Sequence, residues 1–282
     1  MKQTAKRIAH FKDSIFGVMS RLARENNAVN LGQGFPDFDG PEWLKKIAQD
    51  KIQSGHGQYA PFMGTPSLRS AVSRYYERFY KLSYHPETDI TVTAGATEGL
   101  FSTILASVDP GDEVIVLEPF YDSYVASIEM AGGVAIPVTL HAPHFSLVEQ
   151  ELQAAVTSKT KMIIVNNPHN PTGKVWEKSE LEIVARFAVQ HDLLVISDEV
   201  YEFLLFDGAK HFPLAQFPGM YERTFTISSA GKTFGLTGWK TGWVCAPAPL
   251  SKAVRLVHQY VTFSVTTPLQ EAVAEGLERL ET

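Results

Sequence analysis

The chain has 282 residues, of which 44% are hydrophobic and 20% charged, and its formal net charge is −6. This composition excludes a disordered chain and is sufficient for one large core, or one core plus part of a second domain. The acidic balance, without a long basic run, argues against nucleic acid or an anionic membrane surface as a partner, so we expect small molecules or protein.

The single cysteine, Cys245, excludes an internal disulfide. No cluster of histidine, cysteine and acidic residues has the spacing of a zinc or iron–sulfur site, so we predict no metal. The segment Met1–His10 is basic but lacks an apolar core, and no apolar run approaches the length of a membrane span. Together these features predict a soluble protein of a reducing compartment, the cytoplasm.

The first part of the chain has a mixed, turn-rich texture. An irregular arm rich in glycine and proline covers Asn30–Pro41, and a helix is predicted near Glu42–Gln53. A turn-rich stretch at Gly55–Pro66 then leads into a second predicted helix at Ser67–Lys81.

From Asp89 onward, apolar runs typical of strands alternate with helical patterns. The predicted strands are Ile90–Thr93, Glu113–Leu117, Val134–Val138, Met162–Val165, Leu193–Ser197, Thr224–Ser228 and Trp243–Ala246. Helical spacing relates Leu181, Val184, Ala185, Ala188 and Val189, and begins again at Tyr121, Tyr124, Val125 and Ile128. Because the strand runs are continuous, we predict an α/β fold with a mostly parallel central sheet, helices on both faces, and ligands at the carboxyl ends of the strands.

Two segments at the predicted strand ends favour anion binding or covalent chemistry. Gly95–Gly99 opens a helix, whose free amides and positive dipole end suit a phosphate. Ser228–Phe234 and Gly238–Lys240 place small residues and two lysines in a loop after a strand, where a lysine can hold phosphate or form an imine. Taken alone, a Gly-Lys pair is a weak signal and usually a solvated turn.

Two further strand ends carry polar side chains. Asp198 follows one strand and could pair with a protonated ring nitrogen, although a strand-end acid more often caps the next helix. Asn166–Gly173 forms a rigid polar loop after another strand, and turn chemistry alone accounts for its prolines and glycine.

Considered together, these segments resemble the fold-type I, class I and II aminotransferases, which depend on pyridoxal 5′-phosphate. The similarity is strongest to the methionine, kynurenine and glutamine aminotransferase branch. It lies in Asn30–Phe38, Asn170–Gly173, Ser197–Tyr201, Ser229–Phe234 and Gly238–Lys240.

The resemblance implies a role for each matching residue. Lys232 would hold the cofactor through an imine and act as the catalytic base, and Asp198 would keep the cofactor's pyridine nitrogen protonated. The remaining implied cofactor contacts are Ala96, Thr97, Tyr121, Asn170, Tyr201, Ser229 and Lys240. The implied substrate contacts are Gly34, Tyr59 and Asn170, with Tyr59 reaching the phosphate of a neighbouring subunit.

The resemblance also implies a homodimer with shared active sites, in which the segment His258–Ser264 contributes to the partner's pocket. It divides the chain into an N-terminal arm with a small-domain segment, residues 1–40, and a large cofactor-binding domain, residues 41–282. The rest of the small domain, with an arginine for the substrate α-carboxylate, is largely missing from this sequence. The sequence therefore supports cofactor binding better than it supports catalytic turnover.

The implied activity is ping-pong transfer of an amino group from an apolar, aromatic or sulfur-containing L-amino acid, such as methionine, to a 2-oxo acid. Two alternatives stay open: a β-lyase acting on cysteine conjugates with the same cofactor, and a cofactor-binding remnant with little catalysis. A nicotinamide enzyme is disfavoured, because no Gly-x-Gly-x-x-Gly motif follows a predicted strand.

Overall fold

A seven-stranded sheet forms the centre of the molecule. The structure is a computed structural model, and it describes residues 5–34 and 36–281. The strands are β1 (Ile90–Thr93), β2 (Glu113–Glu118), β3 (Val134–Thr139), β4 (Thr160–Asn166), β5 (Leu194–Asp198), β6 (Thr224–Ser229) and β7 (Gly242–Cys245). Their spatial order is β1-β7-β6-β5-β4-β2-β3, and only β7 runs antiparallel to its neighbours. The predicted α/β fold with a mostly parallel sheet is therefore confirmed.

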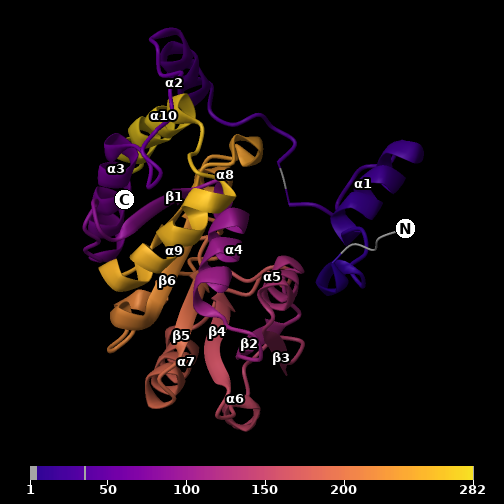
Figure 1. Cartoon of the computed structure of the whole chain (residues 1–282). Helices are drawn as coiled ribbons and strands as arrows, with labels where there is room; N and C mark the ends of the chain where they lie inside the picture. Colours follow the sequence, from indigo (N-terminus) through magenta and orange to yellow (C-terminus); the bar gives the residue numbers. More distant parts are fainter. Residues whose placement is uncertain (1–4, 35, 282) are drawn as a thin grey trace.

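Ten α-helices accompany the sheet in the described part of the chain (Figure 1). They are α1 (Ile15–Glu25), α2 (Glu42–Gln53), α3 (Pro66–Tyr80), α4 (Gly95–Ser107), α5 (Ser123–Ala131), α6 (Glu149–Ala155), α7 (Lys178–Gln190), α8 (Ala230–Thr233), α9 (Ala248–Val261) and α10 (Thr267–Glu278). Short 3₁₀ turns are η1 (Lys6–Ile8), η2 (Leu214–Gln216), η3 (Tyr221–Arg223) and η4 (Thr237–Trp239). The helix predicted from Tyr121 begins two residues later, so Tyr121 lies in the preceding turn.

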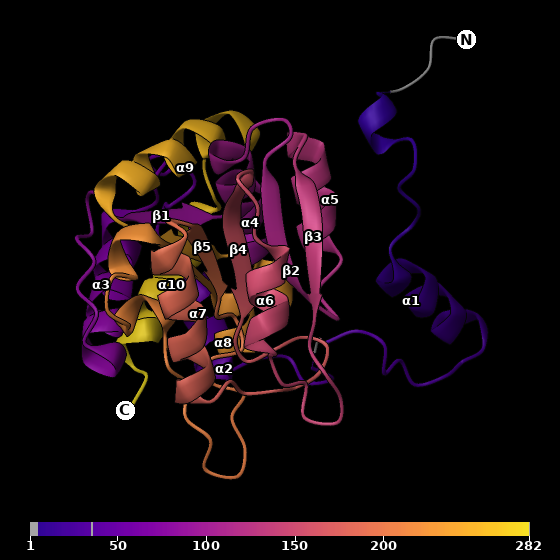
Figure 2. The ribbon, with the colours of Figure 1, turned by 90° about the horizontal axis from the view of Figure 1, so that it is seen from below.

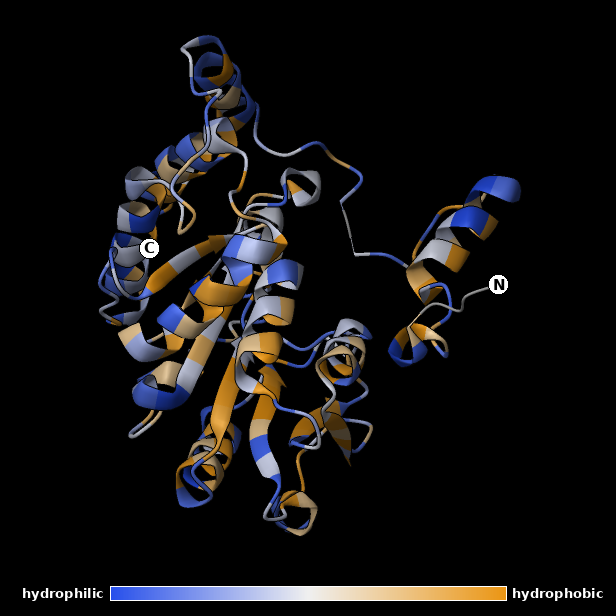
Figure 3. Cartoon of the chain, in the orientation of Figure 1, coloured by the Kyte–Doolittle hydropathy of each residue, from blue (hydrophilic) through white to orange (hydrophobic). Residues whose placement is uncertain are grey.

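Helices cover both faces of the sheet, as predicted. On one face α4, α5 and α9 pack on β-strand side chains such as Val116, Ile164 and Phe225. On the other face α6 and α7 pack on alternate residues of the same strands, among them Ile163 and Val195. Figure 2 shows these two layers, and Figure 3 shows the mostly hydrophobic strands between helices that have one polar side. Strands buried on both sides explain the continuous apolar runs in the sequence.

A third apolar cluster lies at the β1–β7 end of the sheet, where α2, α3 and α10 pack together. Helix α3 begins at Pro66, and the Thr65 hydroxyl accepts a hydrogen bond from the Leu68 amide at 3.3 Å, as expected of an N-cap. By contrast, α1 lies outside the layers of helices that flank the sheet, on the N-terminal arm (Figures 1 and 2). Its Phe16 ring still approaches Tyr121, with centroids 6.1 Å apart. Among the described residues, no helix combines the length and apolar character needed to cross a bilayer.

Candidate active site

The carboxyl ends of the parallel strands meet at one cavity of about 800 Å³. Strand register places Asn166 beside Asp198, and Asp198 beside Ile227 near the end of β6. Nearly all of the site residues predicted from sequence line this cavity: Gly34, Ala96, Thr97, Tyr121, Asn170, Asp198, Tyr201, Ser229, Lys232 and Lys240. Chain segments that are far apart in sequence therefore contribute to one polar site, as the parallel-sheet argument predicted.

Asp198 is the buried acid of the cavity. One of its carboxylate oxygens accepts a hydrogen bond from the Tyr124 hydroxyl at 2.6 Å, and the other accepts from the Val200 amide at 3.4 Å. Burial raises the pKa of Asp198 to about 6, while the hydrogen bonds from Tyr124 and Val200 act in the opposite direction. A cation placed against this carboxylate would favour its ionised form, which suits it to pair with a protonated ring nitrogen.

Lys232 lies in the one-turn helix α8 directly after β6, and not in a loop as predicted. Its ammonium nitrogen donates a hydrogen bond to the carbonyl of Gly34 on the N-terminal arm. Burial lowers the pKa of Lys232, the negative charge of Asp198 raises it, and the positive charge of Lys240 lowers it. The net lowering increases the fraction of free amine, the form that attacks a carbonyl carbon or accepts a proton.

Gly34 leaves space beside the lysine. A Cβ atom added at this position would lie 3.8 Å from both Lys232 Nζ and the Tyr201 hydroxyl, so a side chain would extend into the cavity. The arm segment that carries Gly34 was identified by its sequence as Asn30–Phe38, of which Phe35 lies outside the described residues.

The first turn of α4 forms an anion seat. No side chain caps the start of this helix, so its amides at Ala96 and Thr97 are available. Lys240 approaches closely, since a Cβ at Gly95 would lie 3.0 Å from its Nζ. Strand β7 approaches from the other side, where a Cβ at Gly242 would lie 2.6 Å from the Gly95 carbonyl carbon. A phosphate is the group that these donors suit best.

Tyr201 and Asn170 complete the polar wall. Burial raises the pKa of Tyr201 to about 12, so its hydroxyl stays protonated and can donate a hydrogen bond. The backbone N–H of Asn170 donates to Asn166 Oδ1 at 2.6 Å, and Asn166 Nδ2 donates to the Asp198 backbone carbonyl at 2.9 Å. The Asn170 loop is thereby attached to the strand that carries the acid.

Several cavity residues were not predicted, and three groups of them matter for its chemistry. Tyr124 appeared in the sequence only as an apolar position of a helix face, and Asn166 as the first residue of a turn. The third group, Ile15, Phe16 and Leu31, comes from the N-terminal segment, and the Phe16 ring lies 6.1 Å from that of Tyr121. The available signal for Tyr124 was its hydroxyl on a predicted helix face, since that face packs on the sheet whose strand end carries Asp198.

The predicted substrate contact Tyr59 does not line the cavity. Its side chain is 83% exposed and makes an edge-to-face contact with Phe263, with ring centroids 5.4 Å apart. Exposed apolar residues of α9 and its end, Leu256, Tyr260 and Val261, extend the same surface. Within this chain, therefore, Tyr59 belongs to an exposed aromatic patch.

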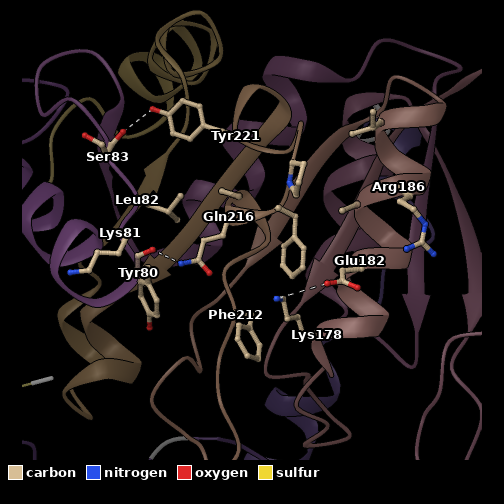
Figure 4. A pocket seen from close by; sticks show the side chains of 15 residues that line it. Tyr80, Lys81, Leu82, Ser83, Lys178, Glu182, Arg186, Phe212, Gln216 and Tyr221 are labelled. Carbon is tan, nitrogen blue, oxygen red and sulfur yellow. Dashed lines mark hydrogen bonds and ion pairs between the residues drawn. The ribbon is translucent and has the colours of Figure 1, made fainter.

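A second cavity, of about 1070 Å³, lies between the end of α3, α7 and residues 212–221 (Figure 4). Apolar side chains such as Phe212 and Leu82 form much of its wall, and Lys178 and Glu182 lie 4.0 Å apart at its edge. None of the site residues predicted from the sequence lines this cavity.

The residues of the first cavity fit the expected cofactor. The amine with a lowered pKa suits its aldehyde, and the buried acid suits its ring nitrogen. The phenol suits its phenolic oxygen, and the uncapped helix start with the nearby lysine suits its phosphate. Because Gly95 and Gly242 carry no side chain, the helix amides stay accessible; a Cβ at Gly242 would lie 2.8 Å from the Ala96 nitrogen.

Comparison with known proteins agrees with this assignment. A sequence model of the family "Aminotransferase class I and II" matches residues 26–281. The solved structure of the N-succinyldiaminopimelate aminotransferase from Mycobacterium tuberculosis is 47% identical, with a TM-score of 0.96 over 98% of this chain and 73% of that one.

Two curated relatives carry other substrate names. A methionine aminotransferase of Escherichia coli is 45% identical over 94% of this chain and 68% of its own length. A kynurenine–oxoglutarate transaminase of Dictyostelium discoideum is 45% identical over 98% of this chain and 67% of its own length.

Proposed function

The chain belongs to the class I and II aminotransferases, which use pyridoxal phosphate, and from this premise we propose that it moves the amino group of an apolar, aromatic or sulfur-containing L-amino acid to a 2-oxo acid. The observation that supports the residue roles is the convergence of Lys232, Asp198 and the α4 helix start on one cavity. Amino acid and 2-oxo acid are the substrate classes of such enzymes.

Each polar group then has a specific task. When bound, pyridoxal phosphate supplies a ring that accepts electrons from the substrate Cα. Asp198 holds a proton at the ring nitrogen, and Lys232 first anchors the cofactor and then moves the Cα proton as a free amine. Tyr201 and Asn170 donate hydrogen bonds to the phenolic oxygen, while Ser229, Lys240 and the α4 amides bind the phosphate.

The substrate preference is supported by the apolar side chains of the cavity. Ile15, Phe16 and Leu31 line it, and its only cationic side chains among the described residues are Lys232 and Lys240. Both of those are assigned to the cofactor, so the apolar side chains are the wall that these residues offer to a substrate side chain. An uncharged substrate side chain is therefore favoured.

We also propose a homodimer and a two-part organisation. The exposed patch of Tyr59, Leu256, Tyr260 and Phe263 is the apolar surface that a second copy would cover, with Tyr59 then reaching the partner's cavity. Residues 1–40 form the arm and small-domain segment, and residues 41–282 the cofactor-binding domain. The position of α1 outside the helical layers of the sheet supports this division (Figure 1).

The function is tested by absorption spectroscopy of the purified chain with pyridoxal phosphate. We expect a visible imine band that is absent in Lys232→Ala and that bleaches on addition of methionine or kynurenine. Bleaching by N-succinyldiaminopimelate in preference to both would contradict the proposed substrate class. A wild-type protein with no imine band would contradict the role of Lys232.

A further inference from the structure

The turn that follows β5 has two sides with different surroundings. Asp198 and Tyr201 face the cofactor cavity. Glu199 and Glu202 alternate with them in sequence and do not line the cavity; they are only 0% and 1% exposed. Two carboxylates are thus buried directly behind the residues proposed to hold the cofactor ring, and the proposed mechanism assigns them no task.

Glu202 connects three parts of the fold. Its Oε1 accepts a hydrogen bond from the Ser228 hydroxyl at 2.7 Å, and its Oε2 accepts from the Tyr80 hydroxyl at 3.0 Å. Ser228 immediately precedes Ser229 at the end of β6, and the chain then enters the helix that carries Lys232. One side chain therefore fixes the turn that carries Asp198 relative to the end of β6, which leads into the helix that carries Lys232.

The other end of this connection is itself anchored. Tyr80 is the last residue of α3, and its carbonyl accepts a hydrogen bond from the side chain of Gln216 at the wall of the larger cavity (Figure 4). The Tyr80 ring also packs edge-on against His211, with centroids 5.6 Å apart. The tyrosine is thus held in place by two further contacts besides Glu202.

Glu199 anchors the start of the same turn. Its Oε1 accepts hydrogen bonds from the Ser197 hydroxyl at 2.7 Å and the Leu214 amide at 3.2 Å, and its Oε2 lies 3.1 Å from His211 Nε2. Burial lowers the pKa of His211, but the hydrogen bond and charge of Glu199 outweigh burial and raise it overall. The Glu199–His211 pair therefore favours the charged imidazole.

The ligand atoms of Glu199, Glu202 and His211 lie within 4.8 Å of one another, which invites comparison with a cation site. All four carboxylate oxygens, however, already have a partner within the protein. Burying carboxylates seldom adds stability over well-packed apolar residues. A carboxylate that accepts two hydrogen bonds instead fixes the local geometry, because both donors must keep one position relative to it.

We propose that Glu202 is a positioning residue, which holds the Asp198–Tyr201 turn in register with β6 through Ser228 and Tyr80. The proposal rests on the roles proposed above for Asp198 and Lys232. Loss of the Ser228 hydrogen bond loosens the turn from the end of β6, and loss of the Tyr80 hydrogen bond loosens it from α3, so that the separation of the ring-nitrogen acid and the lysine is held less firmly.

The test compares Glu202→Leu, Glu202→Gln and Tyr80→Phe in the full chain. In the cofactor-free protein, Glu202→Leu and Tyr80→Phe should speed amide hydrogen exchange in residues 199–204. With cofactor, they should raise the pyridoxal phosphate dissociation constant about fivefold, the equilibrium equivalent of one hydrogen bond. The midpoint of the pH titration of the visible band should also move. Glu202→Gln, which can still bond both partners, should show the smallest changes.

Tyr84→Phe is the matched control. It removes a more deeply buried hydroxyl, which lies 3.1 Å from the Thr226 hydroxyl on the same strand β6 and has no hydrogen bond to Glu202 or Ser228. If Glu202→Leu and Tyr80→Phe change local exchange, affinity and titration no more than Tyr84→Phe does, the proposal is wrong. Should Glu202→Leu not fold, Tyr80→Phe decides alone. Failure of the wild type to bind cofactor would contradict the proposed function, whereas the exchange measurement tests the connection by itself.

Discussion

The two cavities of this protein are similar in size and different in chemistry. The cavity between α3 and α7 measures about 1070 Å³, and its basic side chains Lys81, Lys178 and Arg186 are exposed. The cavity at the strand ends measures about 800 Å³, and it contains a fully buried acid and a lysine whose pKa values are both displaced. A buried acid with a raised pKa that converges with an amine whose pKa is lowered, rather than volume, distinguishes the reactive site.

The physical origin of the difference is the direction of the strands. At the carboxyl edge of a parallel sheet, several backbone segments end together, so side chains from distant parts of the chain converge. The larger cavity lies instead against the outer surface of α7 and is closed by the 212–221 segment. Substitutions in both cavities test whether the two differ in function.

The largest effect is expected from Lys232→Ala, which removes both the anchor and the proton-transferring amine. Transamination should fall at least about ten-thousandfold, the upper range for loss of a general base. Single-turnover assays of the amino acid half-reaction measure this loss. Lys178→Ala, at the wall of the larger cavity, is the matched control and should retain wild-type rates; equal losses in the two variants would remove the distinction between the cavities.

Asp198→Asn should lower kcat about a hundredfold, because a charge-assisted hydrogen bond contributes up to about 3 kcal/mol. In the cofactor-free protein the same substitution should raise the free energy of unfolding at neutral pH, because it removes a buried negative charge. Burial raises the pKa of Asp198 from 3.8 to about 6, so the folded state binds more protons than the unfolded state between these values. Stability conferred by the protonated carboxyl is present at pH 4 and is lost as the pH rises through 6.

Urea unfolding of the cofactor-free protein at pH 4 and pH 7.5 measures this dependence. The raised pKa corresponds to about 2 kcal/mol of wild-type stability lost between pH 4 and pH 7.5, a loss that Asp198→Asn should abolish. An identical pH dependence in wild type and variant would show that Asp198 is not the buried titrating group.

Tyr124→Phe should have a smaller effect. It removes the hydroxyl that donates to Asp198 at 2.6 Å, and this hydrogen bond lowers the pKa of the acid. We expect the pKa of Asp198 to rise further and kcat to fall about fivefold, as for one neutral hydrogen-bond donor. The pH profile of kcat is the measurement, and an unchanged acidic limb would contradict the assignment.

Arg186→Gln should have the smallest effect, because Arg186 is an exposed side chain at the wall of the larger cavity. Stability should change by less than about 0.5 kcal/mol, as is usual for exposed positions, and the steady-state constants should stay the same. Thermal melting and steady-state kinetics test this. A loss of activity comparable to that of Tyr124→Phe would show that the larger cavity takes part in the reaction.

Local sequence patterns were sufficient for the order and type of most elements. The predicted strand Ile90–Thr93 and helix Glu42–Gln53 match the structure residue for residue, and Asp198 lies at a strand end as expected. Continuous apolar runs and helical spacing are properties of neighbouring residues, so they can be recognised without knowledge of the tertiary structure. The family resemblance added the roles of Lys232 and Asn170, which the residues alone left open.

Only the tertiary structure determined which side chains meet. Tyr124 donates to an acid 74 residues away, and Lys232 reaches a carbonyl 198 residues away. Glu202 joins Tyr80 to Ser228, and Gly242 lies against Gly95, although nothing in the local sequence of either residue marks the contact. These contacts depend on strand order and helix packing, which arise from the whole core, whereas secondary structure and strand-end chemistry are encoded within a few neighbouring residues.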